Sequence, residues 1–175
     1  LCTITVTYAG RTATKVVTIQ NDMRPDFLVT GISLVPGGTM PAGKTFTAYV
    51  TVTNQGVVSG DGGYLSLWTN SPAPVTNKVL GNKYSAVGTV SAGKAKAYTF
   101  SAVTVPWSNG VYTIRALVDR MQITTESNET NNQTTLGYTC KMLTNLVVTG
   151  VATIGEGTGT QYTCTAYWSD GSTED

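Results

Sequence analysis

The chain of 175 residues has room for one large domain or two small ones. Only 12% of its residues are charged and its formal net charge is +1, which excludes the strong electrostatic field typical of nucleic-acid-binding and membrane-surface proteins. Histidine is absent, so the commonest general base, the Ser-His-Asp triad and the usual zinc ligand are all excluded.

The composition predicts an all-β protein. Threonine, valine and glycine are abundant, and no stretch repeats its apolar residues every 3.6 positions for long enough to indicate a helix. The sequence contains no apolar run of about 18 residues, so it predicts no membrane span. No signal peptide is recognised at Leu1, and the chain starts in mid-pattern, so we expect residues 1–175 to be a window of a longer protein.

Residues 1–20 are predicted to form a β-hairpin that turns at residues 9–11. Apolar residues and threonine alternate along both arms, and alternate residues of a strand lie on opposite faces. One face would therefore carry the apolar side chains, which are Cys2, Ile4, Val6, Tyr8, Ala13, Val17 and Ile19.

Residues 26–138 predict about seven short strands with the spacing of a β-sandwich. The strands are expected at residues 27–35, 44–54, 64–69, 79–87, 94–105, 110–119 and 133–138. The side chains expected to face inward are Phe46, Ala48, Val50, Val52, Tyr98, Phe100, Tyr112, Ile114, Ala116 and Val118. For the strand at 64–69, the inward face is left open between Leu65 with Leu67 and Tyr64 with Trp68.

The last part of the chain predicts a third unit. Leu146, Val148 and Val151 indicate one strand, and residues 161–168 a second, with Tyr162, Cys164, Ala166 and Trp168 on one face. A turn at residues 169–172 follows.

A polar loop, residues 119–132, contains three of the ten acidic residues of the chain. Carboxylate and amide oxygens crowded into one loop suit Ca²⁺, which takes six to eight oxygen ligands. The candidate ligands are Asp119, Glu126, Asn128, Glu129 and Asn132. The alternative is a turn-rich linker, because asparagine, serine and aspartate all favour turns and EF-hand spacing is absent.

Residues 25–138 resemble the CARDB family, the cell adhesion related domain found in bacteria. The matching stretches are residues 25–29, residues 50–56, the Ala92-Gly93 turn, and Val118-Asp119 followed by residues 126–132. The resemblance implies an Ig-like, seven-stranded antiparallel β-sandwich in a surface protein of a bacterium or archaeon, usually one of a string of domains.

Both ends are similar to parts of a bacterial Ig-like domain of the group 2 type. Residues 4–14 resemble its last two strands, and residues 152–173 resemble its first half. We therefore expect the last two strands of one Ig-like domain at 1–22, the CARDB-like sandwich at 23–139, and the first strands of a following Ig-like domain at 140–175.

These partial units need strands from elsewhere, because a two-stranded hairpin alone is marginally stable in water. A strand of ten residues spans roughly 30 Å, so the two ends of the chain would leave the sandwich at opposite poles and could not meet. We expect successive units to pair head to tail, in a tandem array or a filament of copies.

The Ig-like resemblance places Cys2 and Cys164 where Ig domains carry the bridge between their sheets. This predicts a Cys2–Cys164 disulfide between neighbouring units; the alternative is that both are small apolar residues with free thiols. Cys140 has no predicted partner and is expected to be free or to pair outside the chain.

Two further patterns point to surface chemistry. Asn128 and Asn132 each begin an Asn-x-Thr sequence, the acceptor pattern for N-glycosylation. Trp68, Trp107 and Trp168, together with Tyr64 and Tyr84, are either a platform for carbohydrate or, as is commoner for large aromatic residues, part of the core.

Together these observations predict a non-catalytic, extracellular structural or adhesion protein, a repeat segment of a surface appendage or filament. Its expected partners are copies of itself and a cell-surface or carbohydrate target, with no nucleic acid, and Ca²⁺ is the one candidate cofactor. The alternative is an accessory carbohydrate- or protein-binding module of a secreted hydrolase. An enzyme is not favoured, because the acidic residues cluster in one loop instead of facing each other across a cleft.

Overall fold

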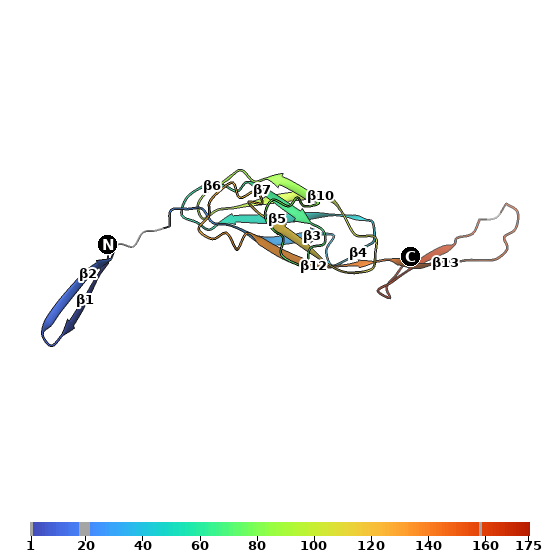
Figure 1. The fold of residues 1–175 in the computed structure, drawn as a ribbon. Coiled ribbons are helices and arrows are strands. Elements are labelled where there is room, and N and C mark those ends of the chain that lie inside the picture. The colour runs from blue at the N-terminus through green and yellow to red at the C-terminus, as the bar shows by residue number, and fades with distance from the viewer. Residues whose placement is uncertain (1, 18–21, 158) are drawn as a thin grey trace.

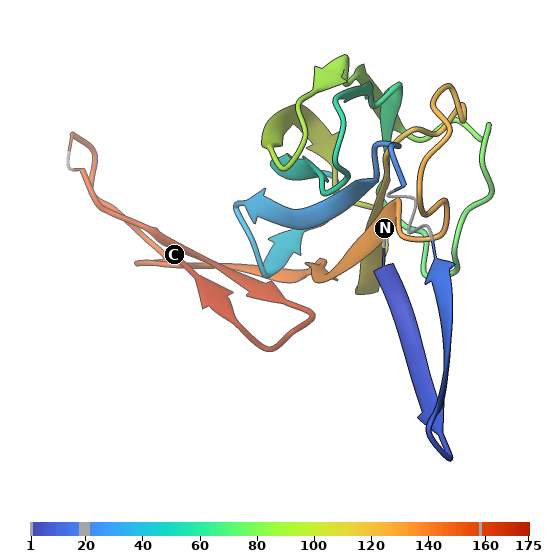
Figure 2. The ribbon, with the colours of Figure 1, turned by 90° about the vertical axis from the view of Figure 1, so that its left-hand side faces the viewer.

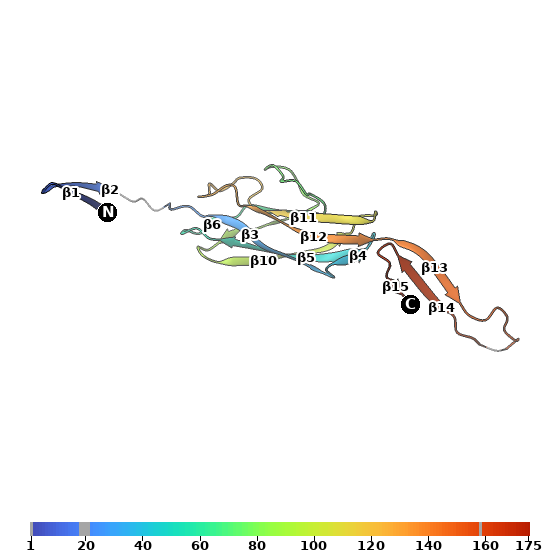
Figure 3. The same cartoon turned by 90° about the horizontal axis from the view of Figure 1, so that it is seen from below.

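The computed structural model describes residues 2–17, 22–157 and 159–175, with the side chain of Cys2 excluded. The described residues form strands, turns and loops and contain no helix, hence none that could cross a membrane. A hairpin, a β-sandwich and a small sheet follow one another along an elongated molecule (Figures 1 and 3). The prediction of an all-β, Ig-like fold is confirmed.

The hairpin consists of β1 (Cys2–Tyr8) and β2 (Arg11–Val17). The sandwich contains β3 (Phe27–Val35), β4 (Thr39–Pro41), β5 (Thr45–Asn54), β6 (Gly60–Asp61), β7 (Tyr64–Trp68), β8 (Lys83–Ala86), β9 (Thr89–Val90), β10 (Ala95–Thr104), β11 (Gly110–Leu117) and β12 (Gln133–Lys141). The C-terminal sheet contains β13 (Leu143–Thr149), β14 (Thr163–Trp168) and β15 (Thr173–Glu174).

Two sheets form the sandwich, one in the order β10-β5-β3 and the other in the order β4-β12-β11-β7-β8. The strands pair antiparallel except β4, which runs parallel to the end of β12. Two short strands, β6 and β9, pair with each other at one side. The two sheets face each other across a single apolar core (Figure 2).

The core follows from the alternation of apolar residues and threonine. Phe46, Ala48, Val50 and Val52 of β5 are buried as predicted, because every second residue of a strand lies on the same face. They meet residues of the opposite sheet, which include Leu65, Leu67, Ile114, Ala116 and Tyr138. The open choice in β7 is thus settled: Leu65 and Leu67 face the core, while Tyr64 is exposed.

Several features differ from the sequence expectation. The strand expected at residues 79–87 is confined to β8, Lys83–Ala86. β4, β6 and β9 were not predicted, because two or three residues are too short to show alternation. β12 runs on to Lys141 instead of ending at Tyr138, since its extension pairs with β4. Tyr98 is only partly buried, and its hydroxyl donates a 2.9 Å hydrogen bond to the Val87 carbonyl at the edge of the core.

The flanking units expose most of their apolar side chains. In the hairpin, Ile4, Val6 and Tyr8 pair with Lys15, Ala13 and Arg11, so the predicted face also carries two charged residues. Ile19, which was expected on this face, lies outside the described residues. The C-terminal sheet has the order β13-β14-β15 and places Leu146 opposite Ala166 and Val148 opposite Cys164. Figure 1 shows these two units at opposite ends of the sandwich.

Candidate functional site

The polar loop lies at the pole of the sandwich where the chain enters β3, and Asp119 begins it. Asp119 is buried, and its carboxylate accepts the backbone N–H groups of Ile123 at 2.9 Å and Thr124 at 3.0 Å. Its backbone has φ 44°, and the side chain supports this turn by bonding to the chain four and five residues on. Burial raises the pKa of Asp119, and the two N–H donors oppose that rise.

Glu126 joins the loop to the first residue of β3. Its side chain is 1% exposed and accepts hydrogen bonds from the Phe27 N–H and, at 2.6 Å, from the Asn132 side-chain amide. Burial raises the pKa of Glu126 to about 7, while the two donors lower it. A carboxylate in this position fastens the loop to the entry strand, but removing its charge from water costs free energy.

Glu129 and Asn128 are exposed and fold the loop onto itself. Glu129 accepts the backbone N–H of Glu126 at 2.8 Å. Asn128 accepts the N–H and the hydroxyl of Thr130 at 3.0 and 2.7 Å. Both side chains therefore bond within the loop, as residues of a tight polar turn commonly do.

Asp26 and Asn54 complete the entry pole, and neither was predicted as a site residue. Asn54 is fully buried; its oxygen accepts the N–H groups of Asp26 and Gly56, and its amide donates to the carbonyls of Val58 and Val90. Asp26 in turn accepts the side-chain amides of Asn131 and Gln55 at 2.8 and 3.0 Å. The sequence offers one signal for Asn54, a lone polar residue at the end of the apolar alternation of β5. A buried amide at such a position must find hydrogen-bond partners.

Four of the five predicted metal ligands already accept hydrogen bonds within the protein. Among the described residues, no group of three or more His, Cys, Asp or Glu side chains could hold a metal ion. The Asp119, Glu126 and Asn128 oxygens already accept N–H groups, whereas the buried Asn131 and Asn132 carbonyl oxygens accept none. Calcium binding by the loop stays a prediction.

The two N-glycosylation patterns differ in accessibility. Asn128 is exposed, whereas Asn132 is buried and bonded to Glu126. A modifying enzyme would therefore reach Asn128 in the folded protein more readily than Asn132.

The cysteines occupy different environments. Cys140 is buried with a free thiol that donates to the Pro106 carbonyl at 3.2 Å, and burial raises its pKa. Cys164 is free and exposed on β14. Cys2 pairs with Val17 in the hairpin, but its side chain lies outside the described residues, so the inter-unit disulfide stays a prediction.

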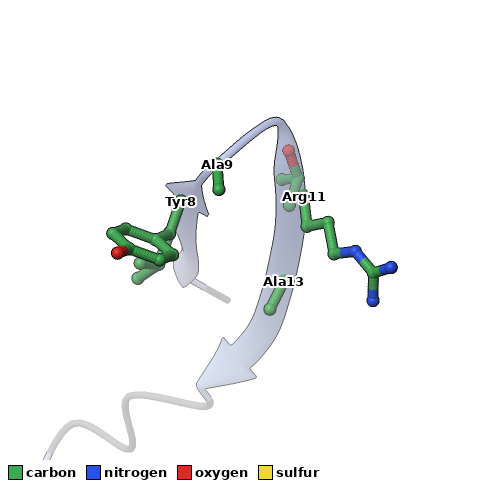
Figure 4. A pocket seen from close by; sticks show the side chains of 6 residues that line it. Tyr8, Ala9, Arg11 and Ala13 are labelled. Carbon is green, nitrogen blue, oxygen red and sulfur yellow. The ribbon is translucent and has the colours of Figure 1, made fainter.

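Two hollows lie away from the polar loop. The first, about 460 Å³, opens on the apolar face of the hairpin beside Tyr8, Ala9, Arg11 and Ala13 (Figure 4). The second, about 240 Å³, lies where the sandwich meets the C-terminal sheet and is lined by Pro41, Ala42, Lys44, Trp107, Met142, Leu143 and Trp168. Trp107 is 75% exposed, so the expectation of core packing is wrong for this tryptophan.

Comparison with known proteins identifies the family. The CARDB family model matches residues 24–136, which is most of the chain. The chain belongs to the CARDB family. The resemblance of the sequence to the CARDB family is therefore confirmed. None of the curated proteins matches this sequence.

Solved structures share the fold of the sandwich. The crystal structure of a CARDB domain from Pyrococcus furiosus in complex with di-metal ions is 23% identical, with a TM-score of 0.55 over 69% of this chain and 97% of that one. The solution structure of the same domain is 24% identical, with a TM-score of 0.52 over 67% and 95%. A domain of a cell surface protein from Methanosarcina acetivorans is 23% identical, with a TM-score of 0.51 over 67% and 93%.

Proposed function

We propose that this chain is a non-catalytic structural segment of an extracellular protein on the surface of a bacterium or archaeon, where it spaces an adhesive unit or carries it outward. The observation that supports this most is the path of the chain. It enters the CARDB sandwich at the pole that holds Phe27 and leaves at the opposite pole through Lys141, so that β-units follow end to end (Figure 1).

The two flanking units support pairing with a neighbouring unit. Each has an exposed apolar face, with Val6 63% exposed in the hairpin and Val148 62% exposed in the C-terminal sheet. Their charges are complementary: residues 2–17 contain two basic and no acidic residues, and residues 143–175 contain four acidic and no basic residues. We propose that strands of a neighbouring unit cover these faces, in a tandem array or between copies in a head-to-tail filament.

Labelling of intact cells tests the proposed location. An antibody against the sandwich should label the outer surface of cells that express the protein at its natural level, and external protease should remove the label. Label that appears only after the cells are opened would contradict the proposal.

A carbohydrate-binding module is the second candidate, and Trp107 is the observation that favours it. A Cβ atom added at Gly43 would meet the Trp107 ring at 2.3 Å, so the ring lies against the chain with 75% of the residue exposed. Exposed indole faces are suited to stacking on sugar rings. If this candidate holds, Trp107→Ala should abolish binding to an immobilised glycan, while the control Val111→Ala, at an exposed position on β11, should retain it.

We also propose that the polar loop binds calcium, and the metal ions bound to the Pyrococcus domain support this. In this chain the loop would have to rearrange, because Asp119 and Glu126 would exchange N–H donors for the ion.

A further inference from the structure

The sandwich and the C-terminal sheet are connected by Met142 alone, the one residue between Lys141 at the end of β12 and Leu143 at the start of β13 (Figure 3). Both neighbouring residues are held in sheets, β12 by β11 and β4 and β13 by β14. Any change of angle between the two units therefore has to occur in the backbone of this single residue.

The backbone of Met142 is bonded on both sides by Ser169. The Met142 N–H donates to the Ser169 hydroxyl oxygen at 2.9 Å, and the Met142 carbonyl accepts the Ser169 N–H at 2.8 Å. The same hydroxyl donates to the Asn109 side-chain oxygen at 3.1 Å, on the loop between β10 and β11. Ser169 thus links the connecting residue to the loop between β10 and β11 of the sandwich.

Lys141 makes a second connection across the junction. Its ammonium group donates to the Ser172 hydroxyl at 2.9 Å and lies 3.8 Å from Asp170 and 4.8 Å from the centre of the Trp168 ring. Asp170 also accepts the N–H and hydroxyl of Ser172, which fixes the turn that Lys141 contacts. A hydrogen bond, an ion pair and a cation–π contact therefore converge on one side chain.

We propose that Ser169 and Lys141 lock the connecting residue Met142, so that the CARDB sandwich and the C-terminal sheet move as one rigid body. Relative motion is the usual expectation for two domains joined by a small interface. Here the hydrogen bonds between the two units fall on the connection itself. The inference deepens the proposed spacer role, and its biological meaning depends on that role, because a rigid joint would set the direction in which the next unit projects.

Residual dipolar couplings of the backbone amides test the joint in the full chain. Couplings from β3–β12 and from β13–β15 should fit one common alignment tensor. In the double variant Ser169→Ala, Lys141→Ala, the common fit should be lost, with smaller couplings in the C-terminal sheet. Lys44→Ala is the matched control: it removes a lysine from the same junction, and in the described structure this side chain makes no hydrogen bond or ion pair.

Amide shifts of both units in the double variant must show that each remains folded; if the C-terminal sheet unfolds, the single variants Ser169→Ala and Lys141→Met take its place. Separate tensors in the unmodified chain would overturn the inference, and so would a common tensor that survives loss of both side chains. Neither result would bear on surface location, which the labelling experiment tests separately.

Discussion

The hydrogen bonds of Glu126 stabilise the fold, whereas the burial of its charge is unfavourable. It fastens the polar loop to β3 through the Phe27 N–H and the Asn132 amide, yet it is almost completely buried. Because burial raises its pKa from 4.5 to about 7, the folded protein holds the proton more tightly than the unfolded chain does. The stability that this gives is fully present below pH 4.5 and is lost as the pH rises through about 7.

Replacement of Glu126 by glutamine should remove this pH dependence. The free energy of unfolding of the unmodified chain should fall by up to about 3 kcal/mol relative to Glu126→Gln between pH 4.5 and 7. Urea denaturation of both proteins across this range measures the difference. Since the buried Asn132 oxygen is unpartnered, the amide of Asn132 can turn to meet the glutamine. A difference that stays constant with pH would contradict the assignment.

If calcium binds the loop, it should stabilise the folded protein at the pH where ionisation of Glu126 destabilises it. A ligand that binds only the folded protein raises the melting temperature by mass action, and a divalent ion would favour ionised Glu126 and Asp119. We expect millimolar calcium to raise the melting temperature of the unmodified chain at pH 7, with a smaller effect on the combined variant Glu126→Gln, Asp119→Asn. An unchanged melting temperature of the unmodified chain would rule out calcium as a ligand of the loop.

At the scale of single elements, the long strands were predictable and the connections were not. β3 was predicted with its observed bounds and β5 within one residue, because alternation over nine or ten residues is a strong signal. β4 was missed because Thr39–Pro41 offers three residues and a proline, and it exists only through pairing with β12. Long-range pairing of this kind leaves no local pattern in the sequence.

The polar loop shows the same limit. Its position and its polar residues were predicted, and a turn-rich linker was one of the two interpretations. The partners of its side chains were not predicted, because Phe27 is 99 residues from Glu126 and Asp26 is 105 residues from Asn131. Only the folded chain shows that the loop is an anchor for the start of β3.

Gly56 tests how tightly this anchor is packed. A Cβ atom there would lie 2.5 Å from the Arg24 carbonyl oxygen and 2.7 Å from the Asp26 nitrogen, both of which are backbone atoms. We expect Gly56→Ala to destabilise the sandwich by about 1–3 kcal/mol, the usual cost of overpacking. Gly137→Ala in β12 is the control, since nothing lies within 4 Å of an added Cβ there. Equal stability of the two variants in thermal melts would mean that the entry pole is looser than described.

In the whole molecule, the two units that flank the sandwich each carry a cysteine on a strand. Cys2 in the hairpin and the exposed Cys164 in the C-terminal sheet lie on strands at opposite ends of the molecule (Figure 1). A bridge between them would have to join neighbouring units, or copies of the chain.

Electrophoresis without and with reductant tests this bridge on the purified chain. If copies are cross-linked, a ladder of oligomers should appear without reductant and collapse to monomer with it. Cys164→Ser should abolish the ladder, whereas Cys140→Ser should not, because Cys140 is buried. Free thiols at Cys2 and Cys164 in the native protein would rule the bridge out.

Electron microscopy of the native surface material would show the proposed end-to-end arrangement itself. We expect linear strings in which β-units follow one another end to end, with the chain entering each CARDB sandwich at one pole and leaving at the other. Compact single particles, in which a folded monomer of these residues takes no strands from a neighbouring unit, would contradict it.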